Sequence, residues 1–127
     1  MLMGFGGAAR EDADPILDEA YLSELAIAIG QDGLKEVLLS ARANLARLRM
    51  KLSDAAAAGD MTSVRKIAHA LLGTCAQIGA FEVRVLASFI SGEAQTLDEI
   101  RALMLDLNNA LDFLDANLAA RVSSHSS

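Results

Sequence analysis

The sequence predicts an all-α protein: an antiparallel, up-down four-helix bundle with an additional short N-terminal helix packed against it. Three observations support this fold class. Hydrophobic residues make up 53% of the 127 residues and aromatic residues only 4%, so the apolar content is mainly alanine and leucine, which lose little conformational freedom in a helix. The single proline, Pro15, leaves the rest of the chain without the strongest helix breaker. Apolar residues recur at every third or fourth position, and no segment alternates as a strand does.

The short N-terminal helix is expected to begin at Asp14. Residues 1–13 are glycine-rich at their start and have no hydrophobic period, so we expect a flexible segment there. Asp14 suits a helix N-cap and Pro15 the first helical turn. The apolar residues that follow on one face are Leu17, Tyr21, Leu25 and Ala28. Gly30 should end this helix.

Three further helices are expected between residues 34 and 91. The first follows a turn at Asp32-Gly33 and ends at Gly59, and its apolar positions step by four and three residues: Leu34, Leu38, Ala41, Leu45, Leu48, Leu52 and Ala55. The next two helices span residues 61–78 and about 81–91. Gly79 and Gly92 follow them, where a left-handed residue would terminate each helix.

The last helix is expected to start behind a capping box formed by Thr96 and Glu99. Its apolar stripe comprises Leu97, Ile100, Met104, Leu107, Leu111, Leu114 and Leu118. Because all connections are short, consecutive helices should be antiparallel neighbours in one domain of residues 14–122. Residues 123–127 are predicted to be a disordered tail.

Composition and charge exclude several classes of function. Seventeen acidic and 11 basic residues give a net charge of −6, which repels polyanions, so we expect neither nucleic acid nor a membrane as partner. No run reaches the roughly 18 apolar residues of a membrane span, and no signal peptide is apparent. The one cysteine, Cys75, cannot form an internal disulfide, which favours the cytoplasm. His125 has no metal-ligand spacing to His69 or Cys75, so neither a metal site nor a cofactor is expected.

His69 is the candidate functional residue. On a helical wheel with Leu71 at zero, the predicted buried stripe is Val64, Ile67, Ala68, Thr74, Cys75 and Ile78. His69 falls at about 160°, on the opposite face. The residues that share this face are Thr62, Arg65, Lys66, Gly73, Ala76 and Ala80. We therefore expect the imidazole to face water, with little side-chain bulk after it.

Imidazole is a competent phosphoryl acceptor, because its neutral form keeps a lone pair on one ring nitrogen. Arg65 and Lys66, one turn earlier, place positive charge where a phosphoryl oxygen could lie. Helical spacing alone, however, predicts an ordinary surface histidine more often than a reactive one.

The run from Ala68 to Ala80 resembles the signature of the histidine-containing phosphotransfer (HPt) family, which can be written A-H-x-L-K-G-(S/T)-x-x-x-(L/I)-G-A. The matching residues are Ala68, His69, Leu71, Gly73, Thr74, Ile78, Gly79 and Ala80. The resemblance extends from about Asp14 to Asn117. One position departs from the pattern: Leu72 replaces the family's lysine.

The resemblance implies that His69 accepts a phosphoryl group from the aspartate of a response-regulator receiver domain and passes it to another receiver. Receiver domains, a hybrid histidine kinase, or both would then be the partners, and the receiver would bring the aspartyl phosphate, Mg²⁺ and its own lysine. The chain would be a monomeric phosphocarrier without an ATP site, not an enzyme. The residues expected to support the phosphate are Arg65, Lys66 and Gly73. The residues expected to contact the partner are Thr62, Leu72, Ala76, Gln77 and Ala80.

Other interpretations remain open at this point. With leucine in place of lysine, the chain could be an HPt-shaped, receiver-binding regulatory module that does not transfer phosphate efficiently. A purely structural helical protein is a further alternative. Leu72 itself could pack against a neighbouring helix or form part of an apolar docking patch. The heptad-like spacing of the outer helices could serve a dimer as well as an internal core.

Overall fold

The computed structural model of the chain describes residues 16–94 and 96–126. This described part is helical apart from short connections and contains no strand. In chain order the elements are α2 (Glu19–Ala57), α3 (Met61–Ile78), α4 (Phe81–Ser88), a short π-helix η1 (Phe89–Glu93) and α5 (Leu97–Ser126). The predicted all-α fold class is therefore confirmed.

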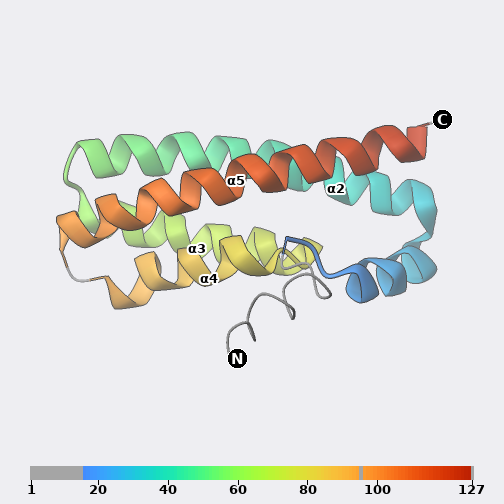
Figure 1. Ribbon diagram of the computed structural model, residues 1–127, viewed down its shortest axis with the longest axis horizontal. Helices are drawn as coiled ribbons and strands as arrows, with labels where there is room; N and C mark the ends of the chain where they lie inside the picture. Colours follow the sequence, from blue (N-terminus) through green and yellow to red (C-terminus); the bar gives the residue numbers. More distant parts are fainter. Residues whose placement is uncertain (1–15, 95, 127) are drawn as a thin grey trace, which may run out of the picture.

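The long part of α2 and the three later helices form one antiparallel bundle (Figure 1). Helix α2 packs against α3 and α5, and α4 packs against the same two neighbours. Consecutive helices run in opposite directions, so the chain passes up and down around a common core. Two ion pairs on the outside, Arg42 with Asp115 and Arg49 with Asp112, join α2 to α5.

All four helices of the bundle contribute to one hydrophobic core. The largest fully buried side chains are Leu38, Leu52, Val64, Leu71, Cys75, Ile78, Ile90, Ile100, Leu107, Leu114 and Leu118. Each large apolar side chain that is buried contributes about 1.5–3 kcal/mol relative to an exposed one. The stripes predicted for the two long helices thus face the interior of this chain. No described helix is both long enough and apolar enough to cross a membrane.

The first part of α2 is the expected short N-terminal helix. Asp18 is its N-cap, and the Asp18 carboxylate accepts a hydrogen bond from the backbone N–H of Tyr21 at 3.1 Å. The predicted start at Asp14 and Pro15 and the predicted flexible segment 1–13 lie outside the described residues. This part ends at Gly30, as predicted, where φ is 82° and ψ is 165°.

The chain resumes helical structure directly after Gly30. The predicted turn at Asp32-Gly33 is therefore wrong, since both residues are helical. The physical reason is that one glycine with positive φ is enough to redirect the chain, so no longer loop is required. The result is a sharp bend between two helices.

This N-terminal part packs across the end of the bundle where α3 turns into α4 (Figure 1). The backbone N–H of Asp18 donates to the carbonyl of Gly79 at 2.9 Å. The hydroxyl of Tyr21 donates to the carbonyl of Gln77 at 3.0 Å, and Glu19 forms an ion pair with Arg121 of α5. These contacts hold the N-terminal part of α2 against the bundle.

Of the three other helix ends predicted at glycines, two are confirmed and one is wrong. Gly59 and Gly79 have φ values of 72° and 69° and end α2 and α3. Gly92 is not a left-handed cap, because it lies inside η1. There the backbone N–H of Ala94 donates to the carbonyl of Phe89 at 2.7 Å, a wider turn than in an α-helix. The chain leaves α4 through this wide turn instead of through a left-handed glycine.

The start of α5 has the predicted capping box. The backbone N–H of Glu99 donates to Oγ1 of Thr96 at 3.1 Å, and the backbone N–H of Thr96 donates to Oε1 of Glu99 at 2.9 Å. The helix continues to Ser126, so the disordered tail predicted from residue 123 is not found over residues 123–126. No glycine or proline after Leu118 interrupts the helix, which explains the continuation.

Replacing Gly79 by alanine is expected to lower the free energy of unfolding by at least about 1–2 kcal/mol, the cost of a left-handed conformation for an L residue. The added Cβ would also lie 3.0 Å from Cδ2 of Tyr21 and 3.1 Å from Cβ of Asp18. Gly59→Ala is the matched control, because its Cβ would meet only Cδ2 of Leu97 at 3.9 Å. Urea unfolding should show the larger loss for Gly79→Ala. Equal losses would contradict close packing of the N-terminal helix on Gly79.

Candidate functional site

The helix that carries His69 is fixed at its start by Asp60. The two oxygens of the Asp60 carboxylate accept hydrogen bonds from Oγ of Ser63 at 2.7 Å and from the backbone N–H of Ser63 at 3.1 Å. These hydrogen bonds hold the pKa of Asp60 below its usual value. A negative N-cap also interacts favourably with the helix dipole. The burial of its apolar side then determines how α3 is oriented about its own axis.

The predicted two faces of α3 are present. The buried residues of the helix are Val64, Ala68, Leu71, Thr74, Cys75 and Ile78, and Ile67 is half-buried. His69 lies on the opposite face and is exposed. The other exposed residues predicted there or beside it are Thr62, Lys66, Gly73, Ala76 and Gln77. A partner can therefore reach the imidazole from solvent.

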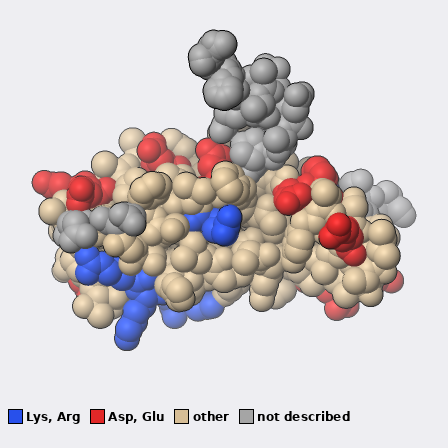
Figure 2. All heavy atoms as spheres, turned by 90° about the horizontal axis from the view of Figure 1, so that it is seen from below, with Lys and Arg blue, Asp and Glu red and all other residues tan. Residues whose placement is uncertain are grey.

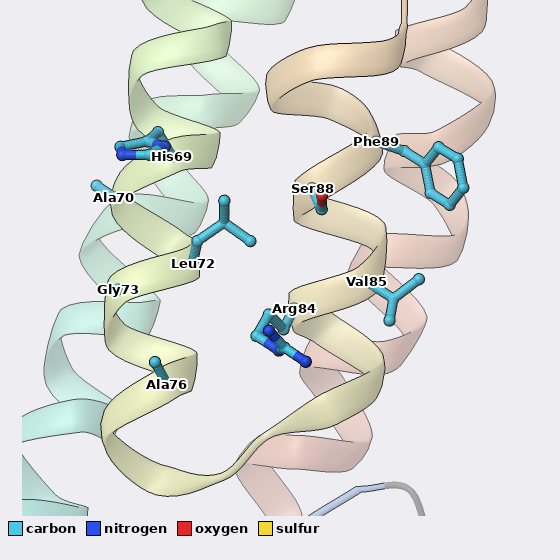
Figure 3. Close-up of a pocket in the computed structure, with 9 residues that line it drawn as sticks. All are labelled: His69, Ala70, Leu72, Gly73, Ala76, Arg84, Val85, Ser88 and Phe89. Atoms are coloured by element: carbon cyan, nitrogen blue, oxygen red, sulfur yellow. The ribbon is translucent and has the colours of Figure 1, made fainter.

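His69 lies at the edge of a groove between α3 and the α4–η1 segment (Figure 3). The groove has a volume of about 810 Å³. Its lining residues are His69, Ala70, Leu72, Gly73 and Ala76 from α3, together with Arg84, Val85, Ser88 and Phe89. Of the helix-wheel face predicted around His69, His69, Gly73 and Ala76 line one wall of the groove, and α4 with η1 supplies the other wall.

Gly73 leaves open space one turn after His69. A Cβ atom built at Gly73 would have no heavy atom within 4 Å. Ala70 and Ala76, which also line the groove, add only a methyl group each. The side of α3 around the imidazole therefore allows close approach of another surface.

The groove walls are mainly apolar. Leu72 is half-buried; it packs against the hydrophobic core and also lines the groove. Phe89, across the groove, is 47% exposed. An exposed aromatic ring beside an apolar groove is typical of a protein-binding surface.

Arg84 is the positively charged residue of the groove. In Figure 3 its side chain is directed toward α3, between the levels of Leu72 and Ala76. The guanidinium carbon lies 5.7 Å from the centroid of the Phe81 ring, a cation–π distance. The groove lining contains no carboxylate.

Arg65 and Lys66 lie one turn before His69, as predicted, but neither lines the groove. Nη2 of Arg65 donates a hydrogen bond to the carbonyl of Ala94 at 3.1 Å, which holds the end of η1 against α3. Lys66 is exposed.

Ala80 is not on the partner-facing surface, and its predicted role in docking is wrong. It is only 1% exposed. The helical wheel placed it beside His69 on the assumption that the helix continues, but α3 ends at Ile78 and Gly79 redirects the chain. Ala80 then becomes the N-cap of α4. Thr62 and Gln77 are exposed but lie outside the groove lining.

Five groove residues were not predicted from the sequence: Ala70 on α3, and Arg84, Val85, Ser88 and Phe89 on the opposite wall. Arg84 and Ser88 are four positions apart, as are Val85 and Phe89, so their common side of a helix could have been noticed. That this side faces His69 follows only from how α4 packs against α3.

Cys75 and Thr74 belong to the structural side of α3. Cys75 is fully buried, as predicted. Thr74 is 5% exposed, and its Oγ1 accepts a hydrogen bond from Nδ2 of Asn44 at 2.6 Å, which joins α3 to α2. Among the described side chains, residues 16–92, 94 and 96–123, no three of His, Cys, Asp or Glu are arranged to bind a metal ion.

Native Cys75 is expected to resist alkylation at pH 8 and to react once the protein is unfolded. Burial raises the pKa of its thiol from 9.0 to about 12, and the thiolate is the reactive form. Because the folded pKa is raised, the contribution of Cys75 to stability is complete below pH 9 and is lost as the pH rises toward 12. Iodoacetamide labelling with and without urea tests this. Rapid labelling of the folded protein would contradict the burial.

The charges are unevenly distributed over the surface. In the view from below, basic side chains gather mainly toward the end where α3 begins, whereas acidic side chains occur at both ends (Figure 2). The whole chain has a net charge of −6. The groove lining itself contains Arg84 and no acidic residue.

Comparison with known proteins supports the fold. No protein-family model and no curated protein sequence matches the chain. Among solved structures, it is similar to the crystal structure of histidine-containing phosphotransfer protein B (HptB) from Pseudomonas aeruginosa PAO1, with a TM-score of 0.72. The similarity covers 87% of this chain and 96% of that chain at 19% sequence identity. The chain therefore has the fold of a histidine-containing phosphotransfer protein.

Proposed function

We propose that this chain is a phosphocarrier of a two-component phosphorelay. His69 accepts a phosphoryl group from the aspartate of a receiver domain and passes it to another receiver. The observation that carries this proposal is the exposed imidazole at the edge of an open groove, on a bundle with the fold of an HPt protein. The sequence around His69, which resembles the HPt signature, supports the same assignment.

In the proposed reaction, a ring nitrogen of neutral His69 attacks the phosphorus of the aspartyl phosphate. A nitrogen–phosphorus bond forms, and the bond between phosphorus and the carboxyl oxygen breaks. The aspartate leaves as a carboxylate with the bonding electron pair, and the proton on the other ring nitrogen stays on the phosphoimidazole. Transfer to the next receiver reverses these steps. The free energy that drives the transfer comes from the acyl phosphate of the receiver, so this chain acts as a carrier of the phosphoryl group.

We propose that Arg65, Lys66 and Gly73 support the phosphoryl group. Arg65 and Lys66 bring two positive charges one turn before His69, and one hydrogen bond to the Ala94 carbonyl leaves other N–H groups of Arg65 available. A charge-assisted hydrogen bond contributes about 1.5–3 kcal/mol. Gly73 leaves room for the group and for the partner.

The proposed docking surface surrounds the imidazole. Leu72 and Ala76 are inside the groove, and Thr62 and Gln77 are exposed beside it. The partners are receiver domains, with or without a hybrid histidine kinase. We propose that the chain is a monomer. We also propose that it is cytoplasmic, because its single cysteine is a buried free thiol, which is typical of a reducing compartment.

The experiment is phosphotransfer from purified receiver domains that carry radiolabelled phosphate on their aspartate. The proposal predicts label on this chain that survives alkali and is lost in acid, as a phosphoramidate should be. Binding of receivers without transfer of label would instead identify a receiver-binding regulatory module. Absence of both binding and label across the receivers of the same genome would contradict the proposed pathway.

A further inference from the structure

Arg84 differs from most other arginines of the bundle in having no counter-charge. Arg42, Arg49 and Arg121 form ion pairs with Asp115, Asp112 and Glu19, respectively. Arg84 has no hydrogen bond or ion pair with any residue that the structure describes, and its one specific contact is the Phe81 ring. It also lies in a groove whose lining has no carboxylate. An exposed, uncompensated guanidinium in an otherwise mainly apolar groove is suited to bind an anion from another molecule.

The position of Arg84 along the groove indicates which anion this is. Leu72 and Ala76 follow His69 by three and seven residues, which corresponds to about 4.5 Å and 10 Å along the helix axis. Figure 3 places the Arg84 side chain between these two levels. It therefore faces the surface that covers the groove beside His69, and not the imidazole itself.

We propose that Arg84 determines partner specificity by forming an ion pair with a carboxylate of the receiver domain that docks over His69. The partner surface would place apolar side chains against Leu72, Val85 and Phe89, and an acidic residue one to two helical turns away from its phosphorylated aspartate. Electrostatic complementarity of this kind selects partners and fixes their orientation. The inference rests on the proposed phosphotransfer function.

Phe81 is the positioning residue for Arg84 in this proposal. Its ring is 53% exposed, and the Arg84 guanidinium lies over it. The cation–π contact restricts the long Arg84 side chain and lowers the entropy cost of ion-pair formation. The contact also gives the exposed ring a function.

The test is the initial rate of phosphotransfer from a radiolabelled receiver domain, measured over a range of receiver concentrations. Arg84→Glu is expected to raise the receiver concentration at half-maximal rate at least about tenfold, an effect typical of a lost interface ion pair, while the maximal rate stays unchanged. Arg84→Lys should recover part of the affinity. Arg101→Glu is the matched control, because Arg101 is exposed on α5 and has only a 3.9 Å contact with Asp98.

Phe81→Leu should weaken receiver affinity less than Arg84→Glu does, and should have no further effect when Arg84 is already replaced. The lifetime of isolated phosphohistidine should be the same in wild type and Arg84→Glu. Equal receiver affinity in Arg84→Glu and Arg101→Glu, a fall in maximal rate alone, or a shortened phosphohistidine lifetime would each overturn the proposal. Failure of the wild type to accept label would contradict the phosphotransfer function itself, so the two failures are distinguishable.

Discussion

Replacing His69 by glutamine is expected to abolish labelling of the chain by phosphorylated receivers. Glutamine has similar polarity, but its amide has no nucleophilic lone pair comparable to that of imidazole. Because His69 is exposed, the free energy of unfolding should change by less than about 0.5 kcal/mol. Receiver affinity should be nearly unchanged, since the groove walls remain. Radiolabel transfer, urea unfolding and a binding titration measure these three quantities.

His125→Gln is the control for this experiment, since the sequence contains two histidines. It should accept label at the wild-type rate. Transfer to His69→Gln at the wild-type rate would show that another residue is the acceptor. Loss of transfer in His125→Gln would assign the reaction to the C-terminal histidine instead.

Gly73 is expected to show opposite effects on stability and on function. Gly73→Ala should raise the free energy of unfolding by about 0.5–1 kcal/mol, because alanine favours helix and the added methyl group meets no neighbour. Gly73→Phe should also fold, since the space beside it is open, but a ring there would keep the receiver away from His69. Reacting atoms must approach to about 3–3.5 Å, so transfer should fall at least about tenfold.

Gly92 offers a matched control, because an added Cβ there also has no neighbour within 4 Å and Gly92 does not line the groove. Gly92→Phe should transfer phosphate at close to the wild-type rate. Thermal unfolding and initial transfer rates of the four variants, alanine and phenylalanine at each position, separate the two effects. A Gly73→Phe protein that is folded and fully active would contradict close docking over this side of α3.

The bundle could be predicted from the sequence because its helices have a regular pattern of burial. Stripes such as Leu34 to Ala55 and Ile100 to Leu118 face the core in the structure. The capping box at Thr96 and the left-handed glycines at positions 59 and 79 are also local features, so the sequence identifies them directly. In each case the residues that determine the feature lie close together in the sequence.

The features that were not predicted depend on tertiary packing. The chain bends at a single residue, Gly30, so no turn forms at Asp32-Gly33. The wide turn of η1 replaces a glycine cap at Gly92 because Ala94 bonds back to Phe89. Helical periodicity contains no information on such wide turns, which arise from how neighbouring helices meet.

Part of the candidate site could be predicted from the sequence, because that part depends on the pattern of a single helix. The exposure of His69 and the gap at Gly73 follow from the period of one helix, and the structure confirms both. The second wall of the groove, including Arg84, comes from a different helix and was missed. Ala80 was misplaced because the wheel extended a helix beyond its left-handed end at Gly79.

The location of the phosphoryl group after one round of transfer distinguishes His69 from every other acceptor residue. The chain would be incubated with a phosphorylated receiver, digested at alkaline pH, and sequenced by electron-based fragmentation in a mass spectrometer. We expect a single phosphorylated site, at His69. A phosphoryl group on any other residue, or a receiver that binds in the groove and keeps its phosphate, would contradict it.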